Sequence, residues 1–311
     1  MKTTPVTPAD LKKSVLSVPP FARNADLSIN AAANQTLIRH LEDGGVSTLL
    51  YGGNANFYHI SIGEYPAVLD TLEQAAGAQS WVIPSIGPDF GRMMDQARIL
   101  KGRNFPTAMA LPIIAPATPS GVEAGLARAA EAFGRPLITY IKTETYLSPA
   151  AVGRLVKSGA VCAIKYAIER KNPREDAYLT ALLGEVPAAA IVSGMGERPA
   201  LVHLQEFGLS AFTSGSVSVA PALSQGILLA AQKGDYATAA ALREKFLPLE
   251  DLRDGLHQIR VLHEAVSLAG IAPMGPILPL LSNIEPEHHD AIRAAATTLL
   301  AANRAGLKAA A

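Results

Sequence analysis

The feature that most constrains the fold of this 311-residue chain is a repeated alternation of short apolar runs with longer helical patterns. Several runs are apolar almost throughout, as strands covered on both faces of a parallel sheet are. A new run follows after roughly 25 to 30 residues, which is the length of a βα unit. The eight runs begin at Ser14, Val46, Ser80, Thr107, Pro136, Val161, Ala188 and Leu209. Eight such units predict a (β/α)8 TIM barrel.

The helical patterns between these runs carry the residues that begin and end helices. The clearest patterns are Ile62–Ala76, Phe90–Arg103, Val122–Phe133 and Pro149–Ser158. Side-chain N-caps, prolines at first helical positions and glycines at helix ends all occur where this reading needs them. We expect N-caps at Ser120, Ser148 and Asn172, first-turn prolines at Pro149 and Pro173, and C-terminal glycines at Gly134 and Gly159.

The strand signal stops near Gly215, and the rest of the chain is helical in pattern. Amphipathic spacing recurs in Tyr236–Phe246, Ile259–Leu268 and His289–Ala302, which predicts a C-terminal helical extension. We therefore divide the chain into a barrel, residues 1–220, and an extension, residues 221–311.

The main alternative architecture is an open doubly wound sheet, which usually carries a Gly-rich phosphate loop after its first strand. Here Pro19-Pro20-Phe21 follows the first run, and Gly52-Gly53 after the second run lacks the third glycine. The sequence therefore supports neither this sheet nor a nucleotide cofactor.

Composition excludes several classes of partner. Lys and Arg total 27, as do Asp and Glu, so no excess of positive charge favours nucleic acid or anionic membrane. No export signal or apolar run of membrane-spanning length is visible. The single cysteine, Cys162, excludes an internal disulfide and favours a cytoplasmic location. No histidine spacing matches a metal site, so no metal is expected.

Lys165 is the strongest candidate for chemistry. It ends the apolar run Val161 to Ile164, where burial would disfavour the ammonium form, lower the pKa and leave a nucleophilic amine. Tyr140 ends the preceding run, so both side chains should reach the barrel mouth, where a phenol can act as general acid and base. Lys142 is a rival nucleophile, but it lies beyond its strand in a polar loop.

These residues resemble those of the dihydrodipicolinate synthase and N-acetylneuraminate lyase superfamily of pyruvate-type class I aldolases. The resemblance covers most of the chain and rests on the turn Gly52 to Phe57, Tyr140, the run Leu147 to Lys165, Ser193-Gly194, Ser218 to Pro221 and Gly234-Asp235. It implies a Schiff base between Lys165 and a 2-oxo acid such as pyruvate, with Tyr140 as proton shuttle and no cofactor. It also implies a substrate carboxylate on the N–H groups of Gly53 and Asn54, a substrate contact at Gly194, and a homotetramer or homodimer.

The chain departs from the dihydrodipicolinate synthase pattern at three places. Gly53-Asn54 stands where a Thr-Thr pair is usual, and Leu111 to Ile114 replaces a tyrosine pair. The arginine that follows the tyrosine in the family has no counterpart, although Lys142 could supply a point charge. We therefore expect an aldolase or dehydratase for a different 2-oxo acid. A true dihydrodipicolinate synthase and a non-catalytic 2-oxo acid-binding barrel remain alternatives. Polar groups that could set specificity are Asn54, Asn56, His59 and Glu144.

Overall fold

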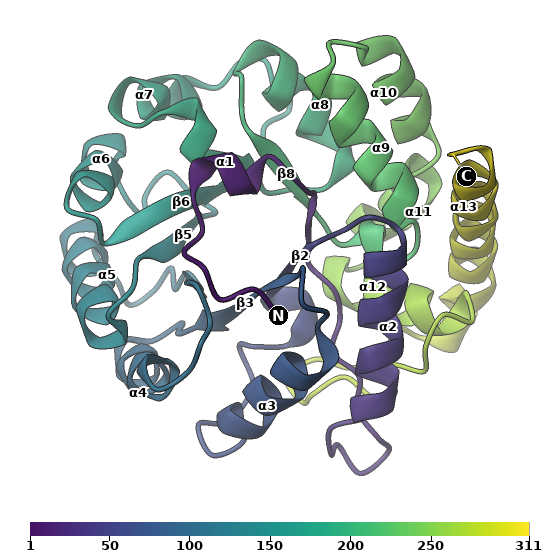
Figure 1. Cartoon of the computed structure of the whole chain (residues 1–311), viewed down its shortest axis with the longest axis horizontal. Helices are drawn as coiled ribbons and strands as arrows, with labels where there is room; N and C mark the ends of the chain where they lie inside the picture. The colour runs from purple at the N-terminus through teal and green to yellow at the C-terminus, as the bar shows by residue number, and fades with distance from the viewer. Residues whose placement is uncertain (311) are drawn as a thin grey trace.

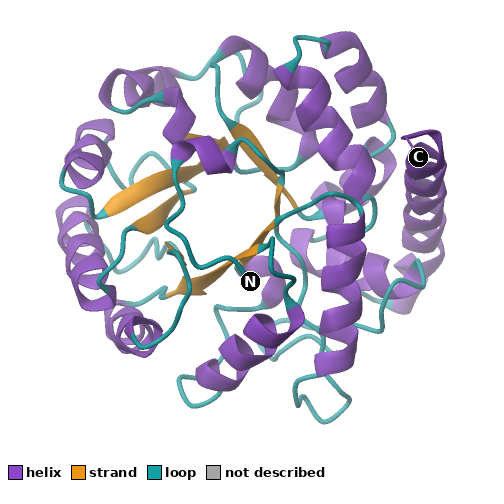
Figure 2. Cartoon of the chain, viewed as in Figure 1, coloured by secondary structure: helices purple, strands orange, loops and turns teal. Residues whose placement is uncertain are grey.

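The computed structural model describes residues 1–310, which contain a closed barrel of eight parallel strands in sequential order. Figures 1 and 2 show the strands at the centre and the helices around them. The strands are β1 (Leu16–Ser17), β2 (Thr48–Tyr51), β3 (Trp81–Ile86), β4 (Ala108–Ala110), β5 (Leu137–Ile141), β6 (Val161–Tyr166), β7 (Ile191–Ser193) and β8 (Ala211–Ser214). Each one lies within its predicted run, so the TIM barrel is confirmed.

Eight helices follow the strands in turn and cover the barrel from outside. They are α2 (Ala31–Asp43), α3 (Tyr65–Ala75), α4 (Phe90–Lys101), α5 (Pro119–Phe133), α6 (Pro149–Lys157), α7 (Ala177–Glu185), α8 (Glu197–Glu206) and α9 (Pro221–Gln232). A short α1 (Pro8–Leu11) precedes β1. Four 3-10 turns lie at η1 (Gly53–Ala55), η2 (Ala188–Ala190), η3 (Ser216–Ser218) and η4 (Pro286–His288).

Two of the predicted helix starts are wrong. The N-cap of α5 is Thr118, not Ser120, because Pro119 takes the first helical position and the Thr118 hydroxyl accepts from the N–H of Gly121. Asn172-Pro173 does not begin α7. The Asn172 side chain instead accepts from the N–H of Arg174 in a turn, and α7 begins after Asp176.

The predicted start of α6 and the two C-terminal glycines agree with the structure, whereas α3 begins at Tyr65 and not at the predicted Ile62. Ser148 caps α6 and Pro149 is its first residue. Gly134 ends α5 at φ 78°, and Gly159 follows α6 at φ 79°. Both glycines therefore adopt the left-handed conformation that a residue with a side chain rarely takes.

The C-terminal part of the chain is helical, as predicted. It continues through α10 (Tyr236–Glu244), α11 (Leu247–Gly255), α12 (Gln258–Leu268) and α13 (His289–Ala310). Helix α9 packs between α2 and α8 in the ring, and α12 packs against η1, η3 and α13. One apolar core joins the barrel to these helices. The division at residue 220 stays a prediction.

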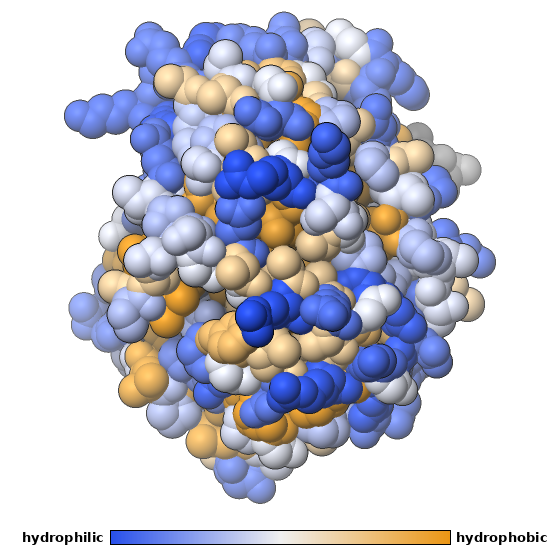
Figure 3. Space-filling model, turned by 90° about the vertical axis from the view of Figure 1, so that its left-hand side faces the viewer, coloured by the Kyte–Doolittle hydropathy of each residue, from blue (hydrophilic) through white to orange (hydrophobic). Residues whose placement is uncertain are grey.

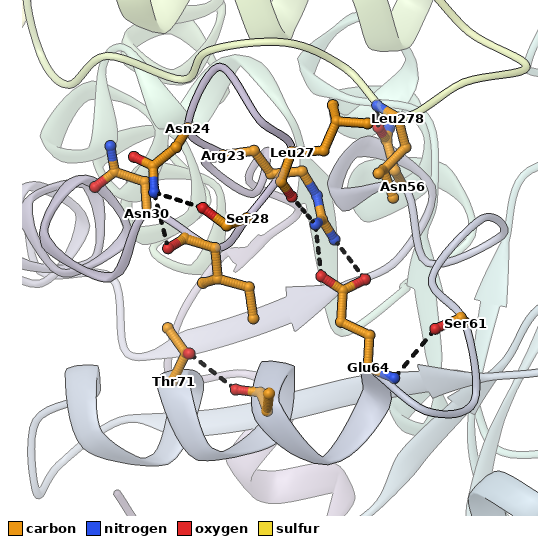
Figure 4. Close-up of polar contacts among 12 residues, drawn as sticks. Arg23, Asn24, Leu27, Ser28, Asn30, Asn56, Ser61, Glu64, Thr71 and Leu278 are labelled. Carbon is orange, nitrogen blue, oxygen red and sulfur yellow. Dashed lines mark hydrogen bonds and ion pairs between the residues drawn. The ribbon is translucent and has the colours of Figure 1, made fainter.

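Polar contacts join the loops on one side of the barrel mouth (Figure 4). Arg23, after β1, forms a two-pronged ion pair with Glu64, just before α3: Nη1–Oε1 is 2.6 Å and Nη2–Oε2 is 3.1 Å. Asn56, at φ 58°, accepts from the N–H of Leu278 through Oδ1 at 3.1 Å. The loops after β1 and β2 are thereby tied to each other and to the segment between α12 and α13.

No helix within residues 1–310 is both long and apolar enough to cross a membrane.

Candidate active site

Lys165 and Tyr140 lie side by side near the C-terminal ends of two neighbouring strands. They are register partners on the adjacent strands β6 and β5. The Lys165 side chain is buried, with 5% of the residue exposed, and its Nζ lies 4.2 Å from the centroid of the Tyr140 ring. The strand ends therefore bring together the two side chains that the sequence analysis singled out.

The pKa of Lys165 is lowered to about 7, first by burial and then by the charge of Lys142. Burial has this effect because the ammonium ion loses its hydration. Lys142 is exposed, and its Nζ lies 6.0 Å from the same tyrosine ring. At neutral pH a substantial fraction of Lys165 is therefore the free amine, the form that attacks a carbonyl carbon.

Tyr140 is a neutral phenol at neutral pH. Burial raises its pKa above the ordinary value, and the neighbouring Tyr58 and Glu169 raise it further. Such a phenol holds its proton firmly and can donate it only to a developing alkoxide or carbanion. It is well placed to accept the proton back when that charge disappears.

Tyr58 is a residue that the sequence analysis missed. It lies in the loop after β2, and its ring packs beside Gly53. Burial raises its pKa to about 12, and its effect on the pKa of both Tyr140 and Tyr146 places it near those phenols. Tyr58 follows the Gly-rich turn by only a few residues, which is the signal that could have drawn attention to it.

A small cavity of about 80 Å³ opens above Lys165. Of the residues predicted for the site, the structure places Lys165, Tyr140, Asn54, Lys142 and Gly194 on its wall. Gly53 does not line the cavity but precedes Asn54 in η1. Further lining residues come from unpredicted positions, namely Glu169, Thr213, Arg253 and Gln258.

The Asn54 side chain, in the turn after β2, already has a hydrogen-bond partner. Asn54 donates from Nδ2 to the carbonyl of Val18 at 2.8 Å, so its amide is already engaged. Gly53 and Asn54 begin η1, where N–H groups have no partner within the helix. Asn54 lines the cavity and Gly53 does not, so the carboxylate site on these N–H groups stays a prediction.

Three of the four residues proposed to set specificity lie elsewhere. Asn56 is buried and holds Leu278, His59 is outside the cavity, and Glu144 pairs with Arg170 at 2.6 Å. Only Asn54 reaches the Lys165 cavity. The role of the other three in specificity stays a prediction, although Asn56 and Glu144 already have polar partners.

Gly194 allows Lys165 to lie close to β7. A Cβ on Gly194 would come within 2.6 Å of the Tyr166 carbonyl oxygen and 3.0 Å of Lys165 Cγ. Its N–H donates to that same carbonyl at 2.6 Å. Any side chain at this position would therefore push against the stem of Lys165.

A larger apolar groove of about 820 Å³ lies between α4 and α5 and includes neither Lys165 nor Tyr140. Phe90, 52% exposed, is one of its lining residues. Figure 3 shows the side of the molecule that carries α5 and α6, where apolar surface interrupts the polar surface. The groove lacks a nucleophile beside an acid or base, so the smaller cavity is the candidate active site.

Within residues 1–310, no three or more His, Cys, Asp or Glu side chains cluster as metal ligands would.

Comparison with solved structures supports the architecture across nearly the whole chain. Dihydrodipicolinate synthase from Bacillus clausii superposes with a TM-score of 0.81 at 21% identity, covering 95% of this chain and 99% of that one. A catalytic lysine mutant of Ruminococcus gnavus sialic acid aldolase also gives 0.81, at 14% identity, covering 95% and 98%. A prophage protein of E. coli K12 from the dihydrodipicolinic acid synthase family, solved with pyruvate, gives 0.79 at 19% identity, covering 92% and 98%.

At these identities the structures establish the fold alone. No curated protein sequence matches the chain. The family model described as the Dihydrodipicolinate synthetase family matches residues 13–298. This match spans β1 to β8 and most of the C-terminal helices, and it includes every residue of the candidate site. The chain therefore belongs to the dihydrodipicolinate synthetase family.

Proposed function

We propose that the protein is a lyase that forms a Schiff base between Lys165 and pyruvate or a related 2-oxo acid. The observation that supports this most strongly is the buried Lys165 amine, with a pKa lowered to about 7, directly over the Tyr140 ring. The family to which the chain belongs includes aldolases and synthases. One structural neighbour was solved with pyruvate, which fits the same class of ligand.

The chemistry begins when the free amine of Lys165 attacks the ketone carbon of the substrate. The carbinolamine then loses water, and the imine that remains draws electrons from the neighbouring carbon. In aldol cleavage a C–C bond at that carbon then breaks, and its electron pair passes into the enamine. In dehydration that carbon first loses a proton to give the enamine, which then expels the hydroxyl on the next carbon as water, with the C–O electron pair leaving on the oxygen. Tyr140 supplies and removes the protons of these steps, while N–H groups of Gly53 and Asn54 bind the carboxylate.

The reaction we favour is aldol cleavage, aldol condensation or dehydration of a 2-oxo acid. It differs from the synthesis of dihydrodipicolinate. The reason is that Gly53-Asn54 and Leu111 to Ile114 replace the hydroxyl groups usual in the synthases. A dihydrodipicolinate synthase with altered proton relay remains the second candidate, since Tyr58 is a phenol near Tyr140. A barrel that binds 2-oxo acids without turnover is the third.

Assembly and location form the remaining part of the proposal. Phe90, the first residue of α4, and Ile114, between β4 and α5, are exposed. Such exposed apolar side chains favour a homodimer or homotetramer. Light scattering after size-exclusion chromatography would measure the mass in solution. The cytoplasmic location stays a prediction from the single Cys162.

Borohydride trapping tests the central proposal. We expect reduction in the presence of pyruvate to leave a pyruvyl adduct on Lys165, identified by peptide mass spectrometry. Lys165→Ala should lose the adduct, and Lys142→Ala, the matched control, should keep it. An adduct on Lys142, or none with pyruvate and longer 2-oxo acids, would refute the proposal. Adduct formation without turnover of any aldol would favour the non-catalytic barrel.

A further inference from the structure

The Lys165 cavity continues into a second, outer cavity of about 490 Å³. The two share Glu169, Met195, Arg253 and Gln258 on their walls. A substrate that extends beyond the imine carbon therefore has a path past these four residues. Arg253 comes from α11 and Gln258 begins α12, so the extension contributes part of this junction.

Arg253 is fixed in its position by a buried set of acceptors. Its residue is 7% exposed. Nε donates to Asp254 Oδ1 at 2.9 Å, Nη2 to the Met195 carbonyl at 3.3 Å, and Nη1 to Glu250 Oε1 at 3.1 Å. A guanidinium has two N–H bonds on Nη1, so one remains for a ligand in the cavity that Arg253 lines.

The carboxyl groups of Glu250 and Glu197 are fully buried next to Arg253 and support its position. Glu250 Oε1 also accepts from the N–H of Glu197, whose own Oε1 accepts from Ser224 Oγ at 2.6 Å. The Oε2 atoms of both glutamates have no hydrogen-bond partner among the described residues. Burial and the neighbouring Glu197 raise the pKa of Glu250, so its carboxyl group keeps its proton at neutral pH.

The backbone beside the pair is also adapted to Arg253. Gly196 has φ 85°, and a Cβ there would lie 2.5 Å from both Arg253 Nη1 and Glu250 Oε1. A glycine is therefore needed where the guanidinium passes the loop after β7. The position of Arg253 is thus built by packing, hydrogen bonds and backbone conformation together.

Two of the four shared residues, Arg253 and Gln258, carry hydrogen-bond donors, whereas Glu169 carries a carboxylate. Arg253 and the Gln258 amide face the path, and Lys142 lines the inner cavity. The outer cavity is lined by four cationic side chains and two carboxylates: Arg170, Lys171, Arg198 and Arg253, with Glu169 and Asp254. Glu169 is exposed, so solvent and salt screen its charge.

We infer that Arg253 is a specificity-determining residue that binds a carboxylate at the far end of the 2-oxo acid substrate. The planar guanidinium suits a carboxylate better than it suits a hydroxyl or an apolar group. The preferred substrate class is therefore a 2-oxo acid with a second, distal carboxylate. This inference rests on the proposed function, because it assigns the two ends of one substrate to Lys165 and Arg253.

A matched pair of 2-oxo acids tests the inference. In 5-methyl-2-oxohexanoate an isopropyl group replaces the second carboxylate of 2-oxoglutarate with little change of shape. Borohydride trapping measures the concentration of each that gives half-maximal adduct on Lys165. We expect the unaltered protein to prefer 2-oxoglutarate, and Arg253→Gln to weaken that ligand roughly 10- to 100-fold. Pyruvate lacks the second carboxylate, so Arg253→Gln should change its half-maximal concentration much less than it changes that of 2-oxoglutarate.

Arg253→Lys keeps a positive charge and covers the case in which Arg253→Gln does not fold. It should lose most of the preference, because a lysine cannot make the hydrogen bonds to Asp254, Glu250 and Met195 that fix the remaining donor in position. Lys171→Gln, a change confined to the outer cavity, is the control and should alter the preference less than about twofold.

The outcomes separate this inference from the proposed function. A pyruvate adduct with no preference for 2-oxoglutarate would overturn the inference alone. The same holds if Lys142→Gln, and not a change at Arg253, removes the preference. Absence of any pyruvate adduct on the unaltered protein would overturn the proposed function, and the inference with it.

Discussion

Removing the charge of Lys142 should raise the pKa of Lys165. The change we choose is Lys142→Gln, which keeps a polar side chain of similar length. The pKa of Lys165 is about 7 because of burial and, secondly, because of Lys142. Without the second ammonium, protonation of Lys165 is less unfavourable, so the free amine should appear at a higher pH.

The size of this effect follows from the positions of the two amines. Their Nζ atoms lie 4.2 Å and 6.0 Å from the same Tyr140 ring centroid, so they are at most about 10 Å apart. At that separation two charges repel by ~1.7 kcal/mol at an effective dielectric constant of 20 and by ~0.4 kcal/mol in water. Lys142 is exposed, so we expect the pKa to rise by ~0.3 to ~1 unit.

The assay is the rate of adduct formation with pyruvate, measured by rapid quenching with borohydride from about pH 5.5 to 9.5. For the unaltered protein the rate should rise about tenfold per pH unit below pH 7 and level off above it, as expected for an amine with this pKa. Lys142→Gln should move the midpoint upward and slow the reaction about two- to tenfold near pH 6, with little change at pH 9.

Lys171→Gln is the control, because Lys171 is exposed and lines only the outer cavity. It should leave the midpoint unchanged. A midpoint near 10 in the unaltered protein would show that the Lys165 amine is not desolvated. A midpoint that falls in Lys142→Gln would show that Lys142 does not act through charge repulsion.

The remaining predictions concern the proton shuttle, the packing around the amine and the buried carboxyl pair. Tyr140→Phe should still form some adduct with pyruvate but slow turnover by roughly 10²- to 10⁴-fold; steady-state kinetics would show this, and unchanged turnover would remove Tyr140 from the mechanism. Gly194→Ala should displace Lys165 and so raise the pyruvate concentration that gives half-maximal adduct. An unchanged concentration would contradict the close packing. Glu250 has a pKa raised to about 8 by burial and by Glu197, against an ordinary value of about 4.3. The folded state therefore holds a proton that the unfolded state releases, and this contribution to the free energy of unfolding falls between about pH 5 and 8. Urea unfolding across that range should show a smaller fall for Glu250→Gln than for the unaltered protein, and equal slopes would argue against the raised pKa.

The sequence predicted the barrel because each strand carries its own signal. Lys165 and Tyr140 end apolar runs, and the rule that parallel strands end at one face of a barrel was enough to bring them together. The helix starts were less predictable. Asn172-Pro173 has the same local pattern as Ser148-Pro149, yet in one case the side chain closes a turn onto Arg174 and in the other it caps a helix. Only the neighbouring chain decides between these outcomes.

The outer part of the site lay beyond sequence reasoning for a different physical reason. Arg253 and Gln258 reach the cavity because α11 and α12 fold back over the barrel mouth, where α12 packs against η1 and η3. The periodicity of the C-terminal extension does not predict which strand ends its helices will cover. The amine that forms the imine is therefore set by the strands, while the groups that select the far end of a substrate come from helices outside the barrel's repeating pattern. Substitutions in α11 and α12 should accordingly change which 2-oxo acid is bound more than they change the pKa of Lys165.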